Sequence, residues 1–198
     1  MADKGKPPTL GTSTVYARFR SATIPPVLTY TFFPTPVGVL YAAATSQGIC
    51  RLTFDATDEA FEEELNARYG TKVLYAPETP LLKKTEVQFE RYFLGEIRQF
   101  DLPCDFLEGT PFYRRVWEML LKIPYGQVRS YRWVAEQVGL PRGARAVGQA
   151  NSRNRIAILI PCHRVINTDG RIGGYGDRLD VKEYLLDLEK AQWKRSAV

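Results

Sequence analysis

The sequence has no long apolar run, no closely spaced cysteines and only one histidine, and each of these absences excludes a class of protein. No stretch approaches the roughly 18 consecutive apolar residues that span a bilayer, and the N-terminus lacks the apolar core of a secretory signal. We therefore expect an intracellular protein with no membrane contact. Among 198 residues, 44% are hydrophobic and 25% are charged, which is typical of a folded chain with one large or two small domains.

The few sulfur and imidazole groups also limit the possible metal sites. Cys50, Cys104 and Cys162 are an odd number, and their wide spacing fits neither a disulfide framework nor a cysteine-rich zinc site. We expect Cys50 and Cys104 to be core thiols. Because His163 is the only histidine, a metal site would need to be built almost entirely from carboxylates and isolated thiols. We expect no metal and no cofactor.

The net charge of +5 comes entirely from the second half of the chain. Residues 1–100 contain 11 Lys and Arg against 11 Asp and Glu, whereas residues 101–198 contain 16 against 11. Such an excess favours contact with the phosphates of nucleic acid. Ordinary surface charge also explains this excess. The charge therefore does not establish that the protein binds DNA or RNA; it indicates only that the second half of the chain would do so.

Turn-forming residues divide the chain into an N-terminal arm and two domains. Residues 1–25 mix Pro, Gly, Ser, Thr and Lys without periodicity, which predicts a flexible or loosely attached arm. Residues 26–105 are expected to form an α/β domain with an antiparallel meander of strands at 27–33, 38–44 and 49–54. Two helices are expected there, one capped by Asp58 over 59–69 and one from Pro80 to about residue 94.

The second domain, over 106–198, is predicted to be mostly helical and to contain a helix-turn-helix. Thr110 and Pro111 predict a helix start, and apolar residues at helical spacing continue to about residue 123. Ser130 is expected to cap a short helix that Gly139 ends, followed by a second helix over 141–150. Any helical hairpin shares this layout, so a DNA-binding unit and a plain hairpin both fit.

The second helix of this pair is rich in small residues. Ala144, Ala146 and Gly148 lie around Arg145, where a major-groove reader would carry long polar side chains. Small side chains permit close approach to a narrow groove, and Arg145 could enter the base stack as side chains of minor-groove binders do. Packing of the small residues against a neighbouring helix explains the pattern equally well.

An apolar run ends at the thiol of Cys162. Residues 156–160 are four aliphatic side chains and one alanine, and they predict a buried strand or a segment close to one, which Pro161 stops. A thiol held there is either a small buried hydrophobe or a nucleophile, and only the thiolate is reactive. The imidazole of His163 is adjacent, but neighbouring side chains diverge, so a bridging water is at least as plausible as a direct bond.

A histidine base needs an acidic group to orient it, and Glu189 is the candidate. We expect a helix that opens at Asp180, with Glu183 three residues later as in a capping box. Glu189 would then lie on the edge of the buried face of this helix. A solvent-facing glutamate beside Lys190 fits the same periodicity.

A glycine-rich segment lies between Cys162 and this helix. Four glycines surround Tyr175 there, and glycine allows the backbone to come close to a ligand. The segment lacks the lysine followed by serine or threonine that ends a phosphate-binding loop, and its spacing differs from that of a dinucleotide fingerprint. These differences exclude nucleotide hydrolysis and nicotinamide binding.

The octet over 158–165, Ile-Leu-Ile-Pro-Cys-His-Arg-Val, resembles the active-site signature of the O6-alkylguanine-DNA alkyltransferases. Positions elsewhere resemble the family in order and spacing, and together they cover about residues 110 to 190: Ser130-Tyr131, the run 144–148, Asn154, Gly174-Tyr175, Lys182-Glu183, Leu185-Leu186 and Glu189. The resemblance implies an α+β protein, with an N-terminal ribonuclease-H-like α/β domain and a C-terminal mostly helical domain with a winged helix-turn-helix.

The resemblance also implies DNA repair by direct reversal. An alkyl group would move from O6 of an alkylated guanine in double-stranded DNA to Cys162, irreversibly and once per protein molecule, after the nucleotide is flipped out through the minor groove. In this family His163 would act through water as the base for the thiol, Glu189 would orient His163, and Asn154 would support the hydrogen-bond network and the turn. We expect the protein to act as a monomer.

The remaining site residues implied by the resemblance contact DNA or the flipped guanine. Arg145 would fill the vacated stack and Tyr131 would crowd the phosphate of the target. Tyr175 would donate to the guanine ring, and backbone groups at Cys162, Val165 and Gly176 would read its edge. Further contacts to substrate or DNA are expected from the same second helix, at Ala144, Gly148 and Asn151.

Two departures from the family and two alternative functions follow from the same residues. The chain lacks the extra cysteine and histidine ligands of relatives with a zinc-binding N-terminal domain, and Gly176 stands where some relatives have serine, which leaves the preferred alkyl size open.

A DNA-binding module without activity would carry a non-nucleophilic residue at Cys162. A cysteine hydrolase using Cys162 and His163 would leave Arg145 and its small neighbours without a purpose.

Overall fold

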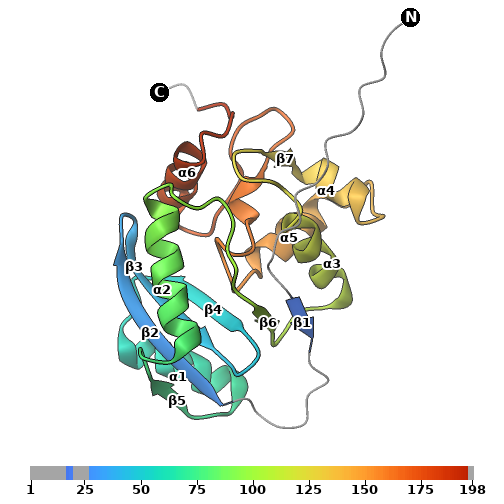
Figure 1. Ribbon diagram of the computed structural model, residues 1–198. Helices are drawn as coiled ribbons and strands as arrows, with labels where there is room; N and C mark the ends of the chain where they lie inside the picture. Colours follow the sequence, from blue (N-terminus) through green and yellow to red (C-terminus); the bar gives the residue numbers. More distant parts are fainter. Residues whose placement is uncertain (1–16, 20–26, 196–198) are drawn as a thin grey trace, which may run out of the picture.

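The structure of the chain is a computed structural model that describes residues 17–19 and 27–195. Three strands form the antiparallel meander that the sequence predicts: β2 (Leu28–Thr35), β3 (Gly38–Ala44) and β4 (Ile49–Phe54). β5 (Val73–Tyr75) pairs in parallel with β2, and β6 (Cys104–Phe106) pairs in parallel with β4. The result is a mixed sheet (Figure 1).

One strand of this sheet lies inside the expected N-terminal arm. β1 (Ala17–Phe19) pairs in parallel with β6, so the sheet has the order β1-β6-β4-β3-β2-β5. The composition of residues 1–25 does not predict a strand, because the pairing depends on the edge that β6 offers and not on local periodicity. The rest of the expected arm lies outside the described residues.

The two faces of the sheet are covered by different helices. α1 (Asp58–Tyr69) packs Phe61 and Leu65 against one face, together with Tyr41 and Ala43 of β3. α2 (Pro80–Phe93) and the C-terminal half pack against the other face, which receives the alternate residues of β3. Successive side chains of a strand point to opposite faces, which explains the division. The cap of α1 is the Thr57 side chain, one residue before the Asp58 that was expected.

The helical half contains the predicted helix-turn-helix. α3 (Pro111–Leu120) begins after its cap Thr110, and α4 (Tyr131–Gln137) begins after Ser130, whose hydroxyl accepts from the backbone N–H of Trp133. α5 (Ala144–Ser152) packs against both helices. It starts three residues later than expected, because a turn in which Gly143 N–H donates to the Leu140 carbonyl comes first.

The last part of the chain holds the cysteine between two short strands and a helix. The 3₁₀ helix η1 (Cys162–Arg164) leads into β8 (Val165–Ile166), which pairs in parallel with β7 (Arg129–Ser130). α6 (Leu179–Leu188) follows, and its first residue comes after Arg178 with no side-chain cap. The expected capping box at Asp180 is therefore wrong: Asp180 lies within the first turn, and its carboxylate binds Arg178.

Residues 156–160, expected to be a buried strand or a segment close to one, do not form a strand, although Ile156 makes an isolated bridge with Leu52 of β4. This segment is buried as predicted, but it forms a tight turn in which the Ile160 N–H donates to the Ile156 carbonyl and Ile158 has a left-handed φ of 73°. Asn154 holds the turn from both ends, because its side chain accepts from Ile156 N–H and donates to the Ile160 carbonyl. Burial alone makes a short segment apolar, so the run could not reveal its backbone conformation.

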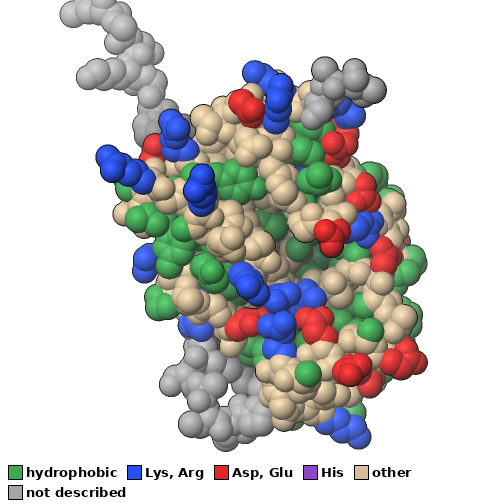
Figure 2. All heavy atoms as spheres, turned by 180° about the vertical axis from the view of Figure 1, so that it is seen from behind, with side chains coloured by type: hydrophobic (Ala, Val, Ile, Leu, Met, Phe, Trp, Pro, Cys, Tyr) green, Lys and Arg blue, Asp and Glu red, His purple; other side chains and the backbone are tan. Residues whose placement is uncertain are grey.

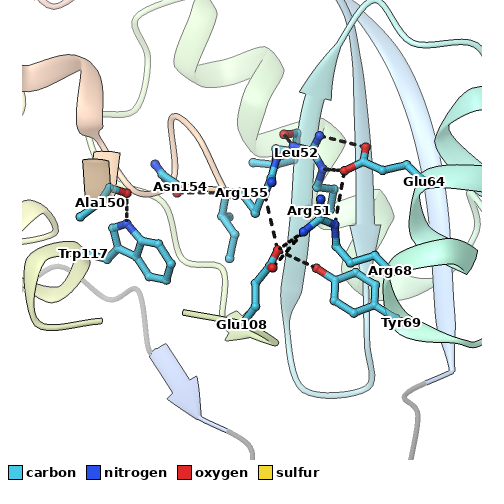
Figure 3. A network of polar contacts seen from close by, with 11 residues as sticks. Arg51, Leu52, Glu64, Arg68, Tyr69, Glu108, Trp117, Ala150, Asn154 and Arg155 are labelled. Atoms are coloured by element: carbon cyan, nitrogen blue, oxygen red, sulfur yellow. Dashed lines mark hydrogen bonds and ion pairs between the residues drawn. The ribbon is translucent and has the colours of Figure 1, made fainter. Parts of the chain in front are cut away.

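A polar network fixes this turn against the N-terminal sheet (Figure 3). The carbonyl of Arg155 accepts from the backbone N–H of Leu52 in β4 at 2.8 Å. Glu108 accepts from Arg68 at 3.0 Å and from the Tyr69 hydroxyl at 3.3 Å, and it lies 3.5 Å from Arg155. The segment that leads to Cys162 is thus attached to β4 and α1, which makes its position depend on both halves of the chain.

Within the described part of the chain, no helix has the length and apolar character needed to cross a bilayer. Cys50 and Cys104 are buried in the two hydrophobic clusters on either side of the sheet, which confirms them as core thiols.

Candidate active site

A cavity of about 490 Å³ lies between β4 and the helical half of the molecule. Its walls are four consecutive residues of β4, parts of α4 and α5, and the loop that precedes α6. On the face of the molecule that Figure 2 shows, basic side chains (Lys or Arg, blue) and acidic side chains (Asp or Glu, red) gather near the middle. Six of the predicted site residues line the cavity besides the cysteine: Tyr131, Gly148, Asn151, Asn154, Tyr175 and Gly176.

The Cys162 thiol lies at the wall of this cavity and is only 6% exposed. The side-chain amide of Asn154 donates to its Sγ at 3.2 Å, so the residue that holds the turn also contacts the sulfur. Burial raises the pKa of the thiol, while the Asn154 donor, the charge of Lys182 and the backbone N–H groups at 162 and 163 oppose that shift. Burial therefore keeps the thiol protonated, although the groups around it favour the thiolate.

His163 and Glu189 form a fully buried pair behind the cysteine. Nε2 of His163 lies 3.0 Å from Oε1 of Glu189, and Nδ1 of His163 is buried without a hydrogen-bond partner among the described residues. Because an ionised carboxylate only accepts, Nε2 carries the proton and Nδ1 keeps its lone pair. Of the two alternatives that periodicity left open for Glu189, the structure has the buried one.

Three further groups converge on the Glu189 carboxylate. Arg164 donates to it from Nε at 2.9 Å and from Nη2 at 2.8 Å, the Tyr92 hydroxyl donates at 2.7 Å, and the backbone N–H of Gly126 donates at 3.0 Å. Burial by itself would raise the pKa of Glu189, but His163 and Arg164 outweigh it and hold that pKa well below its usual range. Glu189 is thus a fixed anion at neutral pH.

Burial lowers the pKa of His163, against the opposing effect of the Glu189 carboxylate. A lowered pKa leaves the imidazole neutral at neutral pH, which is the state that can accept a proton. The pair can therefore serve a nucleophile: the imidazole has a free basic nitrogen, and its orientation is fixed by a carboxylate that four donors hold in place.

Lys182 of α6 is a buried cation close to the cysteine. Its Nζ donates to the Val165 carbonyl at 2.6 Å and lies 3.4 Å from the Gly173 carbonyl. Burial lowers the pKa of Lys182 to about 8, and the thiolate form of Cys162 would raise it again. Val165 is one of the residues whose backbone groups are expected to read the guanine edge; its carbonyl accepts from this lysine, and the residue is not among those that line the cavity.

The two tyrosines expected at the substrate both line the cavity. Tyr131 packs on Gly173 so closely that a Cβ there would lie 2.5 Å from the tyrosine oxygen, and burial raises the pKa of Tyr131 to about 12. The Tyr175 hydroxyl is buried without a hydrogen-bond partner among the described residues, and burial raises its pKa well above the ordinary value. Both therefore stay protonated, as a hydrogen-bond donor must.

Gly176 follows Tyr175 with φ of 57°, a left-handed conformation that suits glycine. Its backbone therefore turns at the cavity wall, directly after Tyr175. The first residues of α5 lie elsewhere: Arg145 is exposed, and neither it nor Ala144 is among the cavity-lining residues.

Arg178 connects the cavity loop to the N-terminal sheet. Its guanidinium binds the carboxylate of Asp55 at 2.6 Å, the carbonyl of Val37 at 2.8 Å and the carboxylate of Asp180 at 2.9 Å. It also lies over the ring of Phe54. Local sequence pattern could not reveal this role, because Asp55 and Val37, its partners in the N-terminal sheet, are more than 120 residues away along the chain.

Comparison with known protein families decides the assignment. The family profile described as "6-O-methylguanine DNA methyltransferase, ribonuclease-like domain" matches residues 28–106, and the profile of the DNA binding domain of the same methyltransferase matches residues 111–191. The chain belongs to this family. Its fold class, an α+β protein with a ribonuclease-like and a DNA-binding domain, is confirmed.

Members of the 6-O-methylguanine DNA methyltransferase family are similar over most of the chain. The methylated-DNA--protein-cysteine methyltransferase of Mycobacterium leprae is 44% identical over 80% of this chain and 90% of its own length. The constitutive enzyme of that name from Bacillus subtilis is 40% identical over 83% of this chain and 97% of its own.

Solved structures of the family have the same fold. A crystal structure of the Mycobacterium tuberculosis O6-methylguanine methyltransferase is 38% identical, covers 83% of this chain and 93% of that one, and has a TM-score of 0.70. A structure of the M. tuberculosis protein in complex with DNA is 37% identical, covers 82% and 92%, and has a TM-score of 0.69.

Besides Arg178, the sequence missed three groups that complete the site of this methyltransferase. Arg164 belongs to the octet and Lys182 to the family pattern, which is the only signal that the sequence carries for them; both are buried in the structure. Tyr92 comes from α2 of the first domain, and no local pattern could place it on Glu189. No group of three or more potential metal ligands gathers within residues 17–19 and 27–195.

Proposed function

We propose that the protein repairs alkylated DNA by moving the alkyl group from O6 of guanine to the sulfur of Cys162, once per molecule. The observation that carries the proposal is the Cys162 thiol, which lies on a cavity of about 490 Å³ in contact with Asn154 and beside the buried pair of His163 and Glu189. A cavity of this size is typical of a binding site for a small organic group such as one flipped base.

The reaction replaces one covalent bond by another. The thiolate of Cys162 attacks the alkyl carbon, a carbon–sulfur bond forms, and the bond from that carbon to O6 breaks. The electron pair of the broken bond remains on the guanine, which takes up one proton. The Tyr175 hydroxyl, buried at the cavity and without another partner among the described residues, is placed to donate to the ring as charge develops there.

The proton of the thiol has an acceptor in His163. Nε2–H of the imidazole donates to Glu189, so Nδ1 can take the proton, through a bridging water as the resemblance to the family implies. The Glu189 anion stabilises the imidazolium that forms, while Lys182 and Asn154 stabilise the thiolate. The thioether product has no good leaving group, so the sulfur is not regenerated and the turnover is single.

DNA is bound through the helix-turn-helix, with α5 in the minor groove. Its small residues permit close approach, and exposed Arg145 takes the place of the extruded nucleotide in the base stack. Tyr131 crowds the phosphate of the target, and Ala144, Gly148 and Asn151 contact substrate or DNA. Backbone groups at Cys162, Val165 and Gly176 read the guanine edge. One monomer acts on one lesion in double-stranded DNA.

Intact-protein mass spectrometry after one exposure to substrate tests the proposal. Incubation with duplex DNA containing O6-methylguanine should add about 14 Da to the peptide with Cys162, because a methyl group replaces the thiol hydrogen. Cys162→Ser and an undamaged duplex are the matched controls and should give no adduct. An unmodified Cys162 with intact lesion binding would instead favour a binding module, and product in excess of protein would favour a hydrolase.

A further inference from the structure

Asn151 of α5 has a buried side-chain amide that no group in the described part of the chain satisfies. Both Nδ2 and Oδ1 are inaccessible to solvent and lack a hydrogen-bond partner there, although the residue as a whole is partly exposed. More than nine in ten buried polar groups in folded proteins are hydrogen-bonded, because leaving one unsatisfied costs its full desolvation free energy. An orphaned carboxamide with one acceptor and two donors therefore calls for an external partner.

The position of Asn151 points to the identity of that partner. The residue lines the same cavity as Cys162 and Tyr175. It lies three residues after Gly148 on α5 and three before Asn154, which donates to the Cys162 sulfur. Gly148 and Asn151 are neighbours on the surface of α5 because they lie three residues apart on it. Asn154 lies just beyond the helix, and its backbone N–H donates to the Asn151 carbonyl at 3.1 Å, so Asn151 is next to the residue that contacts the thiol.

Two residues that line the cavity from different walls thus carry buried polar atoms without a partner in the described part of the chain. The Asn151 amide comes from α5, and the Tyr175 hydroxyl comes from the loop before α6. An apolar alkyl group cannot satisfy either of them. The base of an alkylated guanine can, because its ring nitrogens accept hydrogen bonds and its exocyclic amine donates them.

We propose that Asn151 hydrogen-bonds the base of the flipped O6-alkylguanine inside the cavity, and so acts as a recognition residue of the alkyl transfer. The inference rests on the proposed function of this site and adds the group that the amide recognises. A hydrogen bond from the base offsets the desolvation free energy of the buried amide, so part of the binding free energy comes from this residue.

The test is Asn151→Leu, which keeps the volume of the side chain and removes its polar atoms. Because no hydrogen bond to the described residues is lost, this variant should melt at a higher temperature than the wild type. It should also react about tenfold more slowly with both free O6-benzylguanine and an O6-methylguanine duplex, since each contains the base. Alkylation of Cys162 by iodoacetamide, which resembles no base, should keep its wild-type rate.

Ser152→Ala is the control from the same turn of α5. Ser152 also lines the cavity, but its hydroxyl already donates to the Gln149 carbonyl and so does not lack a partner as the Asn151 amide does. A lower melting temperature for Asn151→Leu would assign the amide a structural role and overturn the proposal. Wild-type rates with both substrates would overturn it too, as would a loss confined to the duplex, which would place the contact on the DNA backbone. Failure of the wild type to gain any adduct would reject the proposed function itself.

Discussion

The guanidinium of Arg178 lies 2.6 Å from the carboxylate of Asp55, and this pair fastens the loop of Tyr175 and Gly176 to the N-terminal sheet. The contact joins residues 123 positions apart in the chain. Both side chains are about a third or more exposed, so the ion pair adds little free energy of unfolding, about 0.2–1 kcal/mol. Its consequence is positional: one wall of the cavity is tied to the domain that does not carry the cysteine.

Asp55→Asn should loosen this wall without unfolding the protein. Asparagine keeps an acceptor for the Val39 N–H and tolerates the left-handed φ of 52° at this position, but it removes the charge that binds Arg178. We expect faster amide hydrogen exchange over residues 173–177 and a loss of stability of at most about 1 kcal/mol. Asp101→Asn, which removes a similarly exposed partner of Lys84, should leave exchange in that loop unchanged.

Glu189→Gln should destabilise the whole fold. It keeps the shape of the side chain but leaves the buried guanidinium of Arg164 and the imidazole of His163 without their anion. Removing one partner of a buried ion pair costs about 3–5 kcal/mol, so chemical denaturation at pH 7 should report a loss of that order. Glu90→Gln on the exposed side of α2 is the control and should stay within about 0.5 kcal/mol of the wild type.

The low pKa of the Glu189 carboxylate also determines how the free energy of unfolding depends on acidic pH. Because the folded pKa of Glu189 lies below its usual value, its stabilising contribution is complete above the unfolded pKa of about 4.3 and is lost as the pH falls toward the folded pKa. The stability difference between wild type and Glu189→Gln should therefore shrink as the pH is lowered below about 4. A difference independent of pH from 7 to 3 would contradict the assignment of Glu189 as the buried anion.

How far the sequence predicts this molecule depends on how local the determining contacts are. The meander of β2, β3 and β4 was predicted within two residues at each end, because alternation and turn residues are local signals. The run 156–160 was predicted to be buried, and it is, but its turn depends on Asn154 and on pairing with Leu52, which periodicity does not encode.

The active site shows the same limit. Cys162 and His163 were found from the sequence because they belong to a distinctive octet, and Asn154 was found because it lies at family spacing before that octet. Glu189 was left with two interpretations, since helical spacing places it at the edge of a face and contacts with residues distant in the sequence, such as Tyr92 and Arg164, bury it. Tyr92 and the β4 wall of the cavity come from the other domain and required the three-dimensional structure.

Lys182→Met should shift the pH dependence of the thiol. Burial raises the pKa of the Cys162 thiol, and the charge of Lys182 opposes this rise. Loss of that charge should therefore raise the pKa of the thiol further. A rise of one unit would lower the rate of alkylation by iodoacetamide at pH 7 about tenfold. Since the pKa of Lys182 is about 8, its charge acts below that pH and fades above it, so the two rates should converge in alkaline buffer. Lys122→Met, at an exposed position, should follow the wild-type profile.

Arg145→Ala should separate nucleotide flipping from alkyl transfer. Arg145 is exposed on α5 and does not line the cavity, so a free base can reach Cys162 without it. Extruding a nucleotide from a duplex costs a few kcal/mol, and the side chain that fills the gap offsets part of this cost. The variant should therefore react with free O6-benzylguanine at the wild-type rate but lose about tenfold or more on an O6-methylguanine duplex.

Arg142→Ala removes an equal charge from the turn before α5 and controls for lost attraction to phosphates. At low salt both variants should bind duplex DNA more weakly, by a similar factor, because each loses at most one phosphate contact. At saturating duplex, where binding no longer limits the rate, Arg142→Ala should recover the wild-type rate and Arg145→Ala should not. Recovery by both variants would show that Arg145 contributes only charge, and the filling of the vacated base stack would then need another residue.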